Sequence, residues 1–114
     1  MSRSENTKTV SERRRIFKYE VPVQMLLALP QKAVTMPKGA VILSVGLQET
    51  ENDAICVVWA DVDLFASSVE RRVFGVWTGA TPPEGGRFVG TAITAGGEYV
   101  VHVYDLGEGA NVQI

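Results

Sequence analysis

Residues 96–104 read Gly96-Gly97-Glu98-Tyr99-Val100-Val101-His102-Val103-Tyr104. Two adjacent glycines are typical of a tight turn, and the β-branched and aromatic residues that follow favour a β-strand. The same arrangement, a turn rich in glycine or proline and then a short apolar strand, returns along most of the chain. Such short and regular spacing is typical of an antiparallel sandwich or a small barrel.

Other segments support this interpretation. Residues 17–21 alternate between apolar and charged side chains, as in a half-buried strand. Residues 54–62 are apolar on both faces, so we expect a central strand with both sides covered. Residues 69–78 alternate as well, with neither face purely apolar. We therefore predict an all-β fold, a small antiparallel β-sandwich or flattened barrel of about six to eight strands.

The composition of 114 residues, 46% hydrophobic and 21% charged, is that of one ordinary globular domain. Residues 1–14 are polar and too poor in apolar side chains to order themselves, so we predict a flexible, disordered N-terminal tail. The single β domain is expected over residues 15–105 and a loose C-terminal tail over residues 106–114. The apolar segment 24–29 could be a helical turn or a strand.

The cellular setting is expected to be the cytoplasm. The chain has one cysteine, Cys56, which lies among aliphatic residues and cannot form an intramolecular disulfide, as suits a reducing compartment. The N-terminus lacks the apolar stretch of a secretory signal. The longest apolar run, residues 25–29, is far below the roughly 20 residues that cross a bilayer. We expect no membrane association.

Composition also argues against several kinds of chemistry. A net charge of −2 makes a nucleic-acid partner unlikely, since phosphate attraction dominates such binding. Zinc needs three or four ligands, and only Cys56, His102 and carboxylates are present, at no familiar spacing. Asp61 and Asp63 share a strand face but are expected to form a solvated strand end. We predict no catalytic residues, metal or cofactor, and hence no enzyme.

The candidate ligand-binding residues combine planar cations with aromatic rings, a set that suits nucleotide bases and phosphates. They are Arg71, Arg72, Arg87, Phe74, Trp77 and His102, with Phe88 close to Arg87. The alternative is that the aromatic residues fill the core while the arginines lie on the surface. His102 is either a residue of a ligand pocket or a strand histidine satisfied by protein partners.

From residue 16 onward, the order of segments resembles a family of small, mostly phage- or prophage-encoded proteins of unassigned function. The resemblance is carried by residues 16–21, 36–45, 59–63, 72–74, 78–79, 88–91 and 101–104. Residues 24–32 look like an insertion relative to that family. The resemblance implies a phage setting, in which small proteins without catalytic equipment often bind a host component.

These observations favour a non-enzymatic, phage-type binding protein that interferes with a host system in the host cell cytoplasm. It would sequester a small nucleotide signal or occupy a host protein. One alternative is a structural or accessory virion protein, and a less favoured one is a module that binds single-stranded nucleic acid. A homo-oligomer is expected because the strand containing Gly75, Val76 and Trp77 is partly apolar on both faces.

Overall fold

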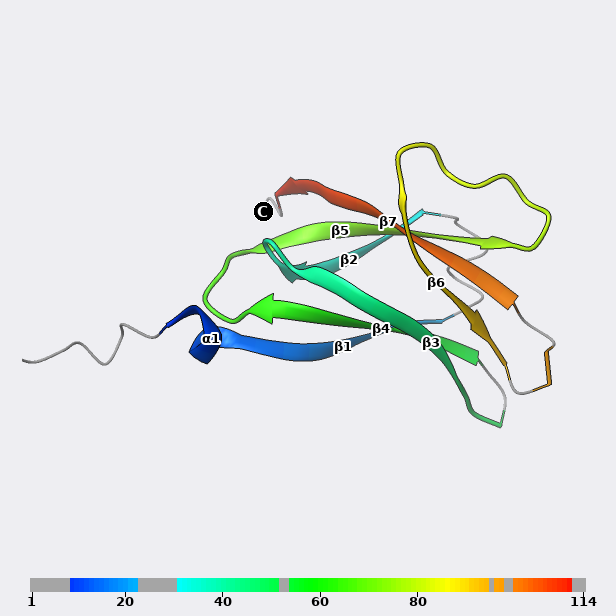
Figure 1. Ribbon diagram of the computed structural model, residues 1–114, viewed down its shortest axis with the longest axis horizontal. Coiled ribbons are helices and arrows are strands. Elements are labelled where there is room, and N and C mark those ends of the chain that lie inside the picture. The colour runs from blue at the N-terminus through cyan, green and yellow to red at the C-terminus, as the bar shows by residue number, and fades with distance from the viewer. Residues whose placement is uncertain (1–8, 23–30, 52–53, 95, 98–99, 112–114) are drawn as a thin grey trace, which may run out of the picture.

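The computed structural model describes residues 9–22, 31–51, 54–94, 96–97 and 100–111, and within these ranges it contains seven β-strands and one helical turn (Figure 1). The elements are α1 (Val10–Arg13), β1 (Arg14–Pro22), β2 (Gln31–Pro37), β3 (Val41–Glu49), β4 (Ala54–Asp63), β5 (Ser68–Trp77), β6 (Arg87–Ile93) and β7 (Val100–Asn111). No helix in the described part of the chain is long and apolar enough to cross a membrane.

The strands form two open antiparallel sheets. One has three strands in the order β1-β4-β3, and the other has four in the order β2-β5-β7-β6. Strands β3 and β6 lie side by side at one edge, where a Cβ on Gly90 would stand 3.3 Å from Val45 Cγ2. The predicted all-β fold with six to eight antiparallel strands is confirmed. Of the two predicted architectures, a β-sandwich or a flattened barrel, the structure is the sandwich.

The core lies between the sheets and follows the alternation of strand side chains. From β4 it takes Cys56, Val58 and Val62, and from β7 it takes Val101 and Val103, all almost fully buried. The prediction that residues 54–62 form a central strand is confirmed, because β4 pairs with β1 on one side and with β3 on the other.

The N-terminal boundary differs from the prediction. Residues 1–8 of the expected tail lie outside the described residues, but residues 10–13 form α1. A capping box begins this turn, since Glu12 N donates to Thr9 Oγ1 at 3.2 Å and Thr9 N donates to Glu12 Oε1 at 2.8 Å. Local hydrogen bonds therefore order residues that composition alone assigned to a flexible tail.

The C-terminal boundary differs as well, because β7 continues to Asn111. Residues 106–111 belong to the sheet rather than to a loose tail, and residues 112–114 lie outside the described part. The pairing of β7 with β5 shifts register between Arg72 and Val73, beside Gly107 with its φ of 89°. Gly107 therefore marks a β-bulge within β7. In the sequence, such a glycine resembles the residue that ends a strand. The segment 24–29 also falls outside the described residues.

Candidate functional site

The outer face of the four-stranded sheet carries a row of aromatic side chains. Val73, Val101 and Val103 point into the core, so the residues that alternate with them point outward. Register places Phe74 of β5 opposite Tyr104 of β7, and Tyr104 opposite Phe88 of β6. We call Phe74, Tyr104 and Phe88 the aromatic row. It crosses three neighbouring strands.

The two rings at the β6 end of this row touch. Phe88 and Tyr104 meet edge to face, with their centroids 5.5 Å apart and their planes at 64°. Phe88 is nevertheless 52% exposed. Large exposed aromatic surface is expensive to leave in water, and on a soluble domain it often marks a contact site.

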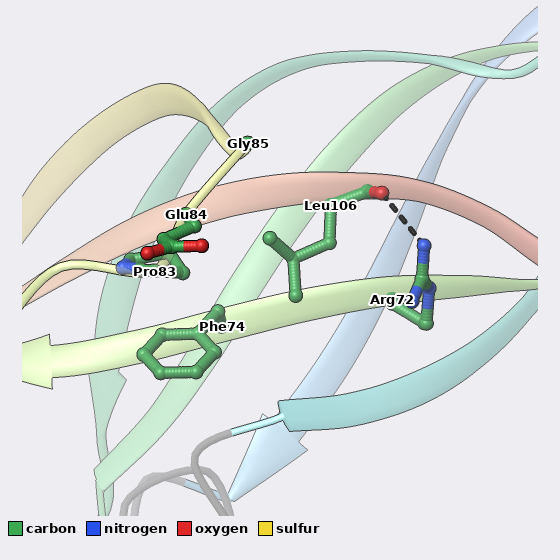
Figure 2. A pocket seen from close by; sticks show the side chains of 6 residues that line it. All are labelled: Arg72, Phe74, Pro83, Glu84, Gly85 and Leu106. Carbon is green, nitrogen blue, oxygen red and sulfur yellow. Dashed lines mark hydrogen bonds between the residues drawn. The ribbon is translucent and has the colours of Figure 1, made fainter.

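A pocket opens beside Phe74, between the outer face of the sheet and the loop 78–86 that joins β5 to β6 (Figure 2). Its volume is about 490 Å³, within the range that holds a small organic ligand. The lining residues are Arg72, Phe74, Pro83, Glu84, Gly85 and Leu106. The pocket thus combines an aromatic ring, a guanidinium, a carboxylate and aliphatic surface.

The loop lies close to the sheet because Gly86 has no side chain. A Cβ there would stand 2.9 Å from Leu106 Cδ2, 3.2 Å from Pro83 Cγ and 3.3 Å from Tyr104 Cβ. Gly85 adopts a φ of 76°, which glycine tolerates at little cost. These two glycines therefore shape the loop side of the pocket.

Arg72 lies across β7 toward a stretch of glycines. Its Nη2 donates to Leu106 O at 3.0 Å (Figure 2), and its Cδ is 3.7 Å from where a Cβ of Gly109 would stand. Its buried Nε has no hydrogen-bond partner in the described part of the chain. Buried donors are usually satisfied, so this Nε is an exception among the described residues, while the Arg72 side chain as a whole lines the pocket.

Arg71 and Arg87 point elsewhere, toward Asp105. Arg71 Nε and Nη2 donate to the two oxygens of Asp105 at 2.9 and 2.7 Å, and Arg87 Nη2 approaches Asp105 Oδ2 at 3.5 Å. Arg71 Nη1 also lies 3.9 Å from Glu108 Oε2. We call Arg71, Arg87, Asp105 and Glu108 the ion cluster. The structure therefore separates two of the predicted arginines from the pocket.

The ion cluster also joins the two sheets. Arg71 Nη1 donates to Ala40 O at 2.6 Å, just before β3, and Arg87 Nη2 donates to Ile42 O at 3.1 Å, near the start of β3. Burial by itself raises the pKa of Asp105. The hydrogen bonds from Arg71 and from Gly107 N, with the arginine charges, outweigh it and lower that pKa below its ordinary value. The carboxylate is therefore ionised at neutral pH.

His102 lies on the outer face but does not line the pocket. Its Nε2 is 2.8 Å from Thr78 Oγ1, and its Nδ1 is 2.9 Å from Thr91 Oγ1. The structure thus supports the alternative in which a strand histidine is satisfied by protein partners. Trp77, at the end of β5, is exposed and does not line the pocket either. Gly75 and Val76, from which self-association was inferred, are buried within the chain itself.

The other candidates for chemistry, two aspartates and one cysteine, are ion-paired or buried. Asp61 accepts a hydrogen bond from Arg14 Nε, and Asp63 Oδ2 lies 3.5 Å from Arg13 Nη2. Burial raises the pKa of the Cys56 thiol to about 11, so it is a poor nucleophile. Among the described residues, no three His, Cys, Asp or Glu side chains are grouped so that they could hold a metal ion.

Of the six predicted binding residues, Arg72 and Phe74 line the pocket. Sequence reasoning missed Glu84, which lies in a loop of turn-forming residues, and Leu106, which was assigned to the tail. It also missed Asp105, although a signal was present. Alternation from Val101 and Val103 places Asp105 in the interior, where a carboxylate needs a cation.

A model of a domain of unknown function, DUF7352, matches residues 12–113. Searches of curated proteins and of solved structures found no match. The expectation of an uncharacterised family is confirmed, whereas phage origin stays a prediction. Because the match spans almost the whole sequence, the chain belongs to the DUF7352 family.

Proposed function

We propose that this chain is a non-enzymatic binding protein that takes a small nucleotide at the pocket beside Phe74. The resemblance to small phage-encoded proteins supports a role in a host cell's cytoplasm, where the protein would sequester a nucleotide signal. The observation that carries the proposal is the grouping of Phe74, Arg72 and Glu84 around one pocket of about 490 Å³.

Each side chain suits a different part of a nucleotide. The Phe74 ring offers a face on which a base can stack, an interaction that accepts any base. The Arg72 guanidinium suits a phosphate, which it can hold through charge-assisted hydrogen bonds. Figure 2 shows Leu106 between Phe74 and Arg72, so the base and the phosphate would lie on either side of this side chain.

Glu84 favours one base over the others. A carboxylate accepts hydrogen bonds and has no donor when ionised. Guanine presents two neighbouring donors, N1–H and the N2 amino group, on its Watson–Crick edge. Adenine and cytosine do not present two neighbouring donors on this edge. We therefore propose that guanine nucleotides bind best. Glu84 would repel phosphate, which is a further reason to place the phosphate at Arg72.

Calorimetry with GMP, AMP, CMP and UMP tests this proposal, together with chromatography of the released ligand. We expect stoichiometric binding of GMP, weaker binding of the others and intact recovery. Saturation at a hundred times Kd should raise the free energy of unfolding by about 2.7 kcal/mol. Turnover of the nucleotide contradicts the non-enzymatic part of the proposal, and no heat with any nucleotide contradicts the ligand class.

Variants distinguish a role of the pocket in binding from a general effect of substitution on the protein. Phe74→Ala and Arg72→Gln should each weaken GMP binding at least tenfold, and Glu84→Gln should reduce the preference for GMP over AMP. Phe65→Ala is the matched control, because Phe65 is an exposed aromatic residue in the turn between β4 and β5. Equal losses in Phe74→Ala and Phe65→Ala would contradict the assignment of the pocket.

The aromatic row favours a second candidate, the binding of single-stranded nucleic acid. Three rings on adjacent strands of an open sheet face resemble the stacking platforms that such proteins use. The two candidates differ in salt dependence, because binding to a nucleic-acid strand releases counterions from many phosphates and therefore weakens steeply as the salt concentration rises. Phe88→Ala should impair oligonucleotide binding while leaving GMP binding unchanged, since Phe88 does not line the pocket.

A further inference from the structure

Strand β1 forms an edge of the three-stranded sheet and pairs only with β4 among the described residues. Residues 14–18 are all exposed, so neither face of this half of the strand is covered. Two large apolar side chains lie here, Ile16 at 58% and Phe17 at 42% exposure. An edge strand with unpaired backbone groups and exposed apolar side chains offers a surface on which another strand can pair.

The backbone groups that face this free edge can be identified. Leu64 N donates to Arg13 O at 2.9 Å, so Arg13 turns its backbone toward the turn after β4. Antiparallel pairing alternates along the strand, and the register with β4 runs without a break from Arg14 to Pro22. The N–H and C=O groups of Ile16, Lys18 and Glu20 therefore point away from β4, toward the free edge.

We propose that β1 pairs antiparallel with β1 of a second copy of this chain, in a register centred on Phe17. This register uses the free backbone groups and sets Arg14 opposite Glu20 of the second copy. It also sets Ile16 opposite Lys18, and Arg15 opposite Tyr19. Opposite charges that face each other across paired strands are stabilising.

The neighbouring register is less favourable. Centred on Lys18, it would also pair the free backbone groups, but it would set two lysines directly opposite each other. Like charges at such positions are destabilising. The centre at Phe17 instead brings two phenylalanine side chains together at a position without backbone hydrogen bonds, where facing side chains come closest. Charge and packing therefore favour the register centred on Phe17 over the one centred on Lys18.

The assembly would be a two-fold symmetric dimer, since the same strand serves both copies. The two three-stranded sheets would become one continuous sheet, and Ile16 and Phe17 would gain side-chain neighbours across the new strand pair. The pocket beside Phe74 lies on the other sheet, so the dimer leaves the proposed ligand site open. This inference does not depend on the proposed function.

Sedimentation velocity from micromolar to several hundred micromolar protein tests the proposal, because one strand pair buries less area than a standard interface. We expect a species of twice the monomer mass of 12.4 kDa. Ile16→Lys puts a lysine opposite Lys18 at two symmetric places in the dimer, and it should weaken the dimer at least tenfold. Ile93→Lys is the matched control, because Ile93 is 57% exposed on β6 of the other sheet, and it should dimerise like the wild type.

Hydrogen exchange provides a readout that needs no variant. The amides of Ile16, Lys18 and Glu20 should become protected as the protein concentration rises, while exposed amides of the loop 78–86 should not change. A wild-type monomer throughout the concentration range would overturn the proposal. So would a dimer that Ile16→Lys leaves intact, or rapid exchange of these three amides in the dimer.

Discussion

Arg71 holds Asp105 through two parallel hydrogen bonds, Nε to Oδ1 at 2.9 Å and Nη2 to Oδ2 at 2.7 Å. Both side chains are largely shielded from solvent, with 11% and 5% exposure. The same guanidinium donates to Ala40 O, one residue before β3 of the opposite sheet. A single ion pair therefore fixes β5 to β7 and both of them to the start of β3.

Replacement of this carboxylate should destabilise the fold strongly. Asp105→Asn leaves the shielded charge of Arg71 with the longer contact to Glu108, at 3.9 Å, in place of its bidentate partner, and breaking a largely buried pair in this way costs about 3 kcal/mol. Urea unfolding followed by circular dichroism measures the loss. Asp61→Asn is the control, because the pair of Asp61 with Arg14 lies on the surface and should matter much less. Equal losses in the two variants would contradict the role of the ion cluster.

The contribution of Asp105 should depend on pH in a defined direction. Its pKa is lowered in the folded protein, against an unfolded value of about 3.9. Its stabilisation is therefore complete above about pH 4 and is lost as the pH falls through the lower folded-state pKa. The difference in free energy of unfolding between wild type and Asp105→Asn should shrink from pH 7 to pH 2. A constant difference would contradict the assignment.

The buried thiol should report unfolding. Cys56 is the single cysteine, is 1% exposed and has its pKa raised by burial to about 11. We expect slow modification by a disulfide reagent at pH 8 in native buffer and rapid modification in concentrated urea, because the reagent needs an exposed thiolate. Asp105→Asn should react faster than wild type in proportion to its lower stability. Rapid labelling of the native protein would show that the core is open.

Two glycines of one loop should respond differently to alanine. Gly86→Ala pushes on Leu106 and Pro83, both of which line the pocket, and should weaken GMP binding at a stability cost of about 1 kcal/mol. Gly79→Ala meets nothing within 4 Å but strains a φ of 93°, at about the same cost in stability. Calorimetry and urea unfolding of both variants compare them. Equal effects on binding would mean that the pocket shape does not matter.

The candidate site was predictable in part. Alternation along residues 69–78 placed Phe74 and Arg72 on one face of a strand, and they share the pocket. The same alternation placed Arg71 on the opposite face, although composition grouped it with Arg72. Glu84 could not be found in this way, because loop residues follow no periodicity that tells where their side chains lie.

The sequence by itself determined the all-β class, a range of about six to eight strands and the central position of residues 54–62, because turn residues and period-two alternation are local signals. Tertiary structure alone decided that Arg71 and Arg87 meet Asp105, that loop 78–86 covers Leu106, and that β7 continues past Gly107. These depend on strand order and register. Both are set by contacts between distant residues, such as Arg71 with Asp105, to which no local pattern refers.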